Sequence, residues 1–142
     1  MFIKYNGYIF LSNEIVMQNY ILTYFFTEAA QNENFAEKIS EKYPQHEHRE
    51  FQGIRYFAFP ARHQESVLDE VNKIVHQFGL GSKDYIALYY TKPKAPDDIV
   101  RHMIVGHDEF IERQLEDVSI QSHQDNLIEL MDRDFVKERA QN

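Results

Sequence analysis

The stretch from Phe51 to Lys92 constrains the fold more than any other part of this 142-residue chain. FQGIRYFAFP and DYIALYYTK are rich in aromatic and β-branched residues, a composition that favours strands. Between them, HQESVLDEVNKIVHQFGL repeats apolar residues three and four positions apart, which gives a helix one apolar face. The order predicts a β-α-β unit with interior strands, because the strands are apolar on both faces. The apolar helix positions are Val67, Leu68, Val71, Ile74, Val75 and Phe78.

Alternation along the two strands predicts which side chains share a face of the sheet. In the first strand, Ile54, Tyr56 and Ala58 face one way, and Phe57 and Phe59 face the other. In the second strand the two sets are Ile86, Leu88 and Tyr90, and Tyr85, Ala87 and Tyr89.

The N-terminal third contains one clear turn signal and one ambiguous segment. FIKY and YIFL flank Asn6-Gly7, the pair best suited to a two-residue type I′ turn, so we expect a hairpin; one long strand bulging at Gly7 is the alternative. For residues 13–30 we favour a helix, although YILTYFF alone has the composition of a strand. NFAEKISEKY then predicts a short helix, capped by Asn32 or Asn34 and stopped by Pro44.

The C-terminal third predicts two acidic helices. Pro96 suits the first turn of a helix, and Asp97 and Asp98 complement the positive end of its dipole. Gly106 would lie inside this helix at a cost of about 1 kcal/mol relative to alanine. The apolar face of the first helix comprises Ile99, Met103, His107, Phe110, Ile111, Leu115 and Val118, and that of the second Leu127, Leu130, Met131 and Phe135.

Together these elements predict an α/β fold, with α+β as the alternative, in a single domain spanning residues 1–142. We expect a mixed sheet of about four to five strands covered by helices, with a ferredoxin-like arrangement as one option. The chain has no cysteine, no secretory signal and no apolar run near the roughly 20 residues of a membrane span, so we expect a soluble cytoplasmic protein.

The net charge of −8 is concentrated at the C-terminal end. Residues 107–142 hold ten acidic side chains against four basic ones, which gives −6 and leaves −2 for the first 106 residues. Such a field repels phosphate backbones and attracts cations or a basic partner, although a solvated helical face is the simpler interpretation. The candidate partner-binding residues are Asp108, Glu109, Glu112, Glu116 and Asp117.

The histidines give no complete site. PQHEHRE predicts a polar connection, in which the geometry of His46 and His48 is unspecified; only in a strand would the two face the same side and be able to share a zinc ion. The sequence identifies no third or fourth ligand, so we expect neither a metal nor a cofactor. His102 and His107 are five apart and fall on different helix faces, unlike the i, i+4 pair of zinc proteases. His107 beside Asp108 is the alternative catalytic hypothesis, a general base near neutral pH.

Two segments resemble the signatures of RNA-recognition domains. IFLSN, which begins at Ile9, is similar to their first-strand signature, and GIRYFAF, which begins at Gly53, to their third-strand signature. The resemblance implies a split β-α-β fold and an RNA-binding sheet on which Phe10, Tyr56 and Phe59 stack against bases. The acidity of the chain opposes this function, because single-strand binders use a positively charged groove.

We therefore favour a small non-catalytic protein that masks a basic surface of a protein partner and does not bind nucleic acid or membranes directly. Immunity proteins, antitoxins and phage-encoded inhibitors share this size and charge. A homodimer through the C-terminal helices, with its seam at Leu127, Leu130, Met131 and Phe135, is a further hypothesis.

Overall fold

The computed structural model describes residues 2–5, 8–11, 17–62, 66–92, 95–107, 109, 111, 113, 115 and 117–135. A two-stranded sheet pairs β1 (Phe2–Tyr5) with β2 (Tyr8–Leu11), with Tyr5 opposite Tyr8. This register confirms the expected hairpin and its two-residue connection, whereas the Asn6-Gly7 turn itself lies outside the described residues.

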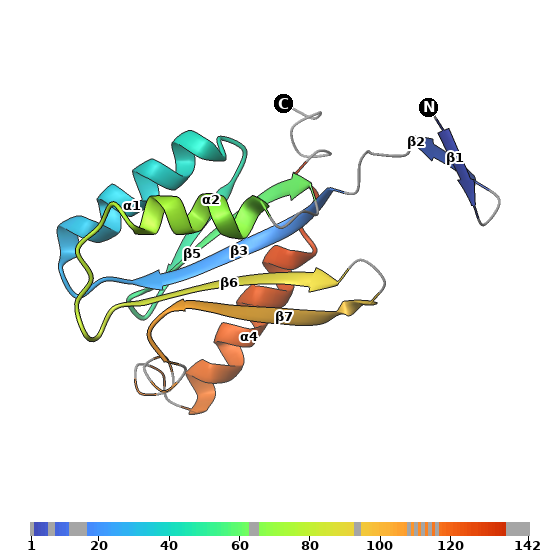
Figure 1. Cartoon of the computed structure of the whole chain (residues 1–142). Coiled ribbons are helices and arrows are strands. Elements are labelled where there is room, and N and C mark those ends of the chain that lie inside the picture. Colours follow the sequence, from blue (N-terminus) through green and yellow to red (C-terminus); the bar gives the residue numbers. More distant parts are fainter. Residues whose placement is uncertain are drawn as a thin grey trace.

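A five-stranded antiparallel sheet forms the centre of the fold, in the order β4-β5-β3-β6-β7 (Figure 1). Its strands are β3 (Met17–Phe25), β4 (Glu47–Phe51), β5 (Ile54–Arg62), β6 (Tyr85–Lys92) and β7 (Ala95–Val105). Every neighbouring pair is antiparallel, so the architecture is α+β and the prediction of a mixed sheet is wrong. Since β5 and β6 both pair with β3, they run parallel to each other with β3 between them.

Helices cover both faces of this sheet, as Figure 1 shows. α1 (Ala29–Lys42) and α2 (Ser66–Val75) lie on one face, and α4 (Asp117–Met131) lies on the other. The predicted alternation in β5 and β6 is confirmed: Tyr56 and Tyr85 face α4, whereas Phe57 and Leu88 face α1 and α2. None of the helices in the described part of the chain is long and apolar enough to span a membrane.

The central helix follows its predicted pattern. Val67, Val71, Ile74 and Val75 of α2 are buried, and Phe78 packs beside them. α1 begins about five residues earlier than expected, and it ends at Lys42, just before Pro44. Asn32, an expected cap, lies inside α1 and exchanges two 3.0 Å hydrogen bonds with the backbone of Phe26, so it fastens the helix to the end of β3.

The helix expected over residues 13–30 is wrong. Residues 17–25 form β3, the central strand, and Tyr20–Tyr24 are at most 2% exposed. Tyr20, Leu22 and Tyr24 pack under α1 and α2, while Ile21 packs under α4. The strand composition of YILTYFF is decisive because a segment with strands on both edges and helices over both faces needs apolar residues on both sides.

The helix expected from Pro96 is also wrong, because residues 95–105 form β7 against β6. Ile99 and Met103 are four residues apart, an even spacing that places them on one face in either a strand or a helix. Gly106, with φ of 89°, lies just after the strand in a conformation that favours glycine. Only one of the two expected acidic helices, α4, is therefore present in the described residues.

The polar stretch before Phe51 is a strand and not a connection. Residues 47–51 form β4, which pairs with β5 through a turn at Gln52 and Gly53. Both turn residues have positive φ, 51° and 83°, as a two-residue type I′ hairpin requires. The segment FQGIRYFAFP, expected as one strand, therefore contains the last residue of β4, the two turn residues and most of β5 (Ile54–Arg62).

The side chain of Asn19, on β3, helps to hold the C-terminal end of α4 to the sheet. The amide nitrogen of Asn19 lies 3.1, 2.9 and 2.6 Å from the carbonyl oxygens of Leu130, Met131 and Arg133. Carbonyls at a helix end have no partner within the helix, so Asn19 supplies the donor that they lack. Gln45 adds a 2.7 Å bond to the carbonyl of Phe135.

We expect Asn19→Ala to lower the free energy of unfolding by about 1 to 3 kcal/mol, because it leaves partly buried carbonyls without a donor. Urea denaturation followed by circular dichroism measures the change. Asn34→Ala, an exposed position on α1, is the matched control and should change stability by less than about 0.5 kcal/mol. Equal effects of the two substitutions would show that Asn19 does not anchor α4.

Gly106→Ala should have opposite effects on stability if Gly106 lies inside a helix and if it lies in a turn after a strand. In a helix, alanine would raise stability by about 1 kcal/mol. At a positive φ, the added Cβ should lower it by about 1 kcal/mol or more. A higher thermal midpoint for Gly106→Ala than for the wild type would contradict the strand and turn described above.

Candidate functional site

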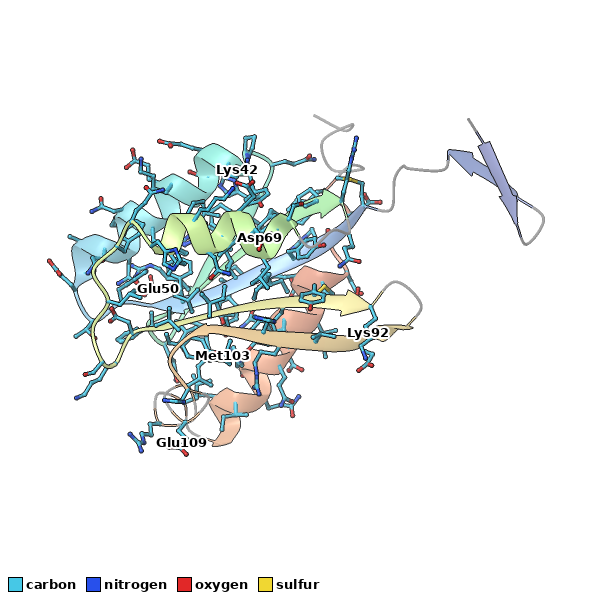
Figure 2. All side chains as sticks on the ribbon, in the orientation of Figure 1. Lys42, Glu50, Asp69, Lys92, Met103 and Glu109 are labelled. Atoms are coloured by element: carbon cyan, nitrogen blue, oxygen red, sulfur yellow. The ribbon has the colours of Figure 1, made fainter. Side chains whose placement is uncertain are left out.

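The expected partner-binding residues fall mostly outside the side chains that the structure describes. Glu109 is exposed where β7 leads toward α4, and its carboxylate lies 3.6 Å from Arg113 (Figure 2). Asp117 is the first residue of α4, but nothing is described of its side chain, and Asp108, Glu112 and Glu116 lie outside the described residues. The structure thus places one of the five acidic side chains.

Part of the C-terminal charge is neutralised by ion pairs. Glu129 on α4 lies 2.7 Å from Arg49 of β4 and 3.4 Å from Arg133, and Glu47 lies 2.6 and 2.9 Å from the same two arginines. The hydrogen bond from Arg49 lowers the pKa of Glu129 below its usual range. The two acids and two bases cancel, so this network joins α4 to the sheet edge and adds nothing to the acidic field.

A second acidic row, which the sequence interpretation missed, lies on α1. Glu33, Glu37 and Glu41 are exposed at spacings of four, so they follow one another along the helix. Glu33 lies 3.6 Å from Arg55, which also lies 3.4 Å from Glu50. Like charges four apart destabilise a helix slightly, and this spacing is the signal that could have identified the row.

His46 and His48 both pack against Phe57 and do not form a metal site with a third ligand. Their ring centroids lie 4.4 and 6.1 Å from that of Phe57. Each histidine already uses one ring nitrogen, His46 with the carbonyl of Tyr43 and His48 with the hydroxyl of Tyr24. Across the described residues, no three histidine or acidic side chains are placed to hold a metal ion.

His102 and His107 are not enclosed with the groups that a general base needs. His102 is exposed on β7, and His107 is exposed just after that strand. His107 does not share one helical face with Ile99 and Met103, because both of these residues lie on β7, which ends at Val105, and Gly106 with its positive φ separates that strand from His107. The catalytic hypothesis therefore loses the burial on which it depended.

Among the described residues, the buried histidine is His123, which the sequence interpretation did not single out. It lies on α4, 6% exposed, and one of its ring nitrogens forms a hydrogen bond with the hydroxyl of Tyr56. Its ring also contacts Tyr89, edge to face. Burial, followed by the positive charge of Arg101, lowers the pKa of His123 to about 4, so the ring is neutral at pH 7.

His123 therefore belongs to the packing between α4 and the sheet. Tyr85 and Tyr89 continue the polar cluster with hydroxyl oxygens 3.3 Å apart, and burial raises the pKa of Tyr85. These side chains are buried between α4 and the sheet, an arrangement that serves packing and that offers a substrate no exposed polar group.

The aromatic set that the RNA resemblance requires is not on one open face. Tyr56 packs under α4 and Phe59 under α1 and α2, both fully buried, so they lie on opposite faces of the sheet. Nothing is described of the Phe10 side chain on β2. Neither Tyr56 nor Phe59 is accessible to a base.

The residues of the hypothetical dimer seam are likewise used within the chain. Leu127, Leu130 and Phe135 are at most 7% exposed and pack against the α4 face of the sheet, and Met131 packs beside them. A dimer, if one forms, requires a different surface.

A cavity of about 310 Å³ opens where β3 ends and where β5 and β6 begin. Its apolar lining comes from these strand ends and from the segment between β7 and α4. Two cationic side chains and one threonine complete it. The lining residues are Phe25, Thr27, Ile54, Lys83, Tyr85, Ile111 and Arg113.

Comparisons of the chain with protein-family models, with curated proteins and with solved structures found no match. The assignment of function therefore depends on the charges, the covered sheet and the cavity.

The lowered pKa of His123 predicts an acid-sensitive stability. The unfolded chain takes up this proton near pH 6.5 and the folded chain only near pH 4. The stability contributed by the neutral ring is therefore complete above pH 6.5 and is lost as the pH falls to 4, by about 2 to 3 kcal/mol. Urea denaturation between these pH values should show the loss in the wild type and a smaller loss in His123→Gln.

His76→Gln, at an exposed position on the turn after α2, is the control for His123→Gln and should keep the wild-type pH profile. If both variants lose stability with falling pH in parallel with the wild type, His123 is not the group that titrates.

Proposed function

We propose that this chain is a non-catalytic binding protein that covers a basic surface of a protein partner, as immunity proteins, antitoxins and phage-encoded inhibitors do. The observation that carries the proposal is the net charge of −6 over residues 107–142, in a chain whose remainder carries −2. Opposite fields accelerate encounter and discriminate between partners. The residues proposed to provide this attraction are Asp108, Glu109, Glu112, Glu116 and Asp117.

The anchoring of the segment between β7 and α4 supports this proposal. Leu115 is 4% exposed, packs with the core under α4, and donates a 3.1 Å backbone hydrogen bond to Ile111. Glu109 and Arg113 lie on the solvent side of the same short segment. Residues held in place in this way, such as Leu115, lose less conformational entropy when a partner binds beside them.

An apolar side chain on the outer face of α4 supplies the second requirement of an interface. Ile128 is 52% exposed, with the exposed residues Asp125 and Asp132 three positions before it and four positions after it. Binding energy concentrates in apolar anchors, whereas surrounding charges mainly set the rate and the specificity of association.

We also infer that the part of the chain from β3 to β6 has a ferredoxin-like arrangement. The order β6-β3-β5-β4 supports it, together with two helical crossovers on one face that each skip one strand. β7 and α4 would then be additions to that plan. This likeness carries no function, because such folds host many unrelated activities.

The proposal predicts a charge-dependent association rate. The partner is first captured on the immobilised wild-type chain from the source cells and identified by mass spectrometry. A variant with Asp108→Asn, Glu112→Gln, Glu116→Gln and Asp117→Asn should then associate about tenfold more slowly at low ionic strength. Its rate should depend less on salt, because four of the attracting charges are gone.

A matched variant removes four acids elsewhere, with Glu28→Gln, Glu37→Gln, Glu41→Gln and Asp69→Asn. Both variants have a formal net charge of −4, so they differ only in where the charge is lost. The control should associate within about twofold of the wild-type rate. If both variants are slowed equally, net charge alone sets the rate. If the control variant is slowed and the first variant is not, the interface lies on α1 and α2.

A further inference from the structure

The cavity at the end of the sheet combines an apolar lining with positive charge. Phe25 is the last residue of β3, Ile54 is the first of β5, and Tyr85 is the first of β6, so the three strands fix its inner wall. Ile111 closes it from the segment between β7 and α4. Because the hydroxyl of Tyr85 is bonded to Tyr89, this residue offers mainly its ring to an occupant.

Lys83 and Arg113 give the cavity its charge, which is opposite to that of the chain as a whole. Lys83 forms no ion pair with another described residue. Arg113 lies 3.6 Å from Glu109, and both side chains are 74% exposed. Exposed pairs of this kind contribute little free energy, so an incoming anion can replace Glu109 at the guanidinium.

Asp84, the buried acid that follows Lys83 in the sequence, is not part of the cavity lining. Asp84 is 2% exposed, and its two carboxylate oxygens accept backbone hydrogen bonds of 2.9 Å from Thr27 and 2.7 Å from Gly81. Its charge is used to fasten the turn before β6 to the end of β3. Thr27, Lys83 and Tyr85 are positioned around the cavity by this fastening.

We propose that this cavity is a binding site for a small aromatic carboxylate, beside the proposed protein-binding surface, with which it shares the segment between β7 and α4. The volume of about 310 Å³ lies at the lower end of the range for small-molecule pockets, which suits one or two fused rings. The rings pack among Phe25, Ile54 and Ile111, and the carboxylate lies between Lys83 and Arg113. Apolar contact supplies affinity, and the two cations select the charge of the ligand.

Three isosteric probes test the site: naphthalene-2-carboxylate, its neutral carboxamide and its cationic carboxamidine. Titrations are followed by the amide resonances of the ¹⁵N-labelled chain. The carboxylate should shift the resonances of Thr27, Lys83 and Ile111 and bind about tenfold more tightly than the carboxamide, since each exposed ion contact contributes a factor of about 2 to 5. Tighter or equal binding of the carboxamidine, or no shift of these resonances, would overturn the proposal.

Variants separate the site from non-specific attraction. Lys83→Gln combined with Arg113→Gln should weaken the carboxylate about tenfold and leave the carboxamide unchanged, while Lys38→Gln, on the exposed side of α1, should change neither. Thr27→Trp, at an exposed lining position, should block both probes without affecting the thermal midpoint. Unchanged carboxylate binding by the double variant, or by Thr27→Trp, would also overturn the proposal.

Discussion

The burial of β3 on both faces and along both edges is the constraint on which the rest of the structure depends. Residues Tyr20–Tyr24 are at most 2% exposed, and the strand is hydrogen-bonded to β5 on one side and β6 on the other. A strand in this position needs a covering layer on each face, because apolar side chains point both ways. α1 and α2 provide one layer and α4 provides the other.

The second layer has functional consequences because it closes the face that would otherwise be open. Asn19 fixes the end of α4, the pairs among Glu47, Arg49, Glu129 and Arg133 fix its side, and neutral His123 packs beneath it. The aromatic side chains of β3, β5 and β6 are thereby buried, where they contribute to stability. What remains for recognition is the acidic surface proposed to bind a protein, and the end of the sheet where the cavity opens.

The sequence predicted those elements whose hydrophobic period fits only one secondary structure. α2 carries apolar residues at offsets of three and four, an arrangement that a strand cannot place on one face, and it was identified correctly. The predictions for β3 and β7 were wrong because apolar residues on both sides of a strand, or four positions apart, fit a helical pattern equally well. The β4–β5 turn was missed because Gln52-Gly53 is a less familiar turn pair than Asn-Gly.

The candidate sites were harder to predict for a related reason. A charge cluster can be counted from the sequence, but the pairing of one of its members, Glu129, with Arg49 depends on a contact with β4, 80 positions away. The cavity joins residues from β3, β5, β6 and the segment after β7, none adjacent in sequence, and Lys83 carries no local signal at all. His123 was missed because the polar residues around it obscure the apolar face of α4.

Native-state hydrogen exchange tests the central claim most directly. If β3 is the enclosed central strand, the amides of residues 20–24 exchange only through global unfolding, with an exchange free energy equal to that of unfolding and larger than those of the edge strands β4 and β7. Faster exchange of these amides than of the edge strands, or helical backbone chemical shifts across residues 17–25, would contradict the account.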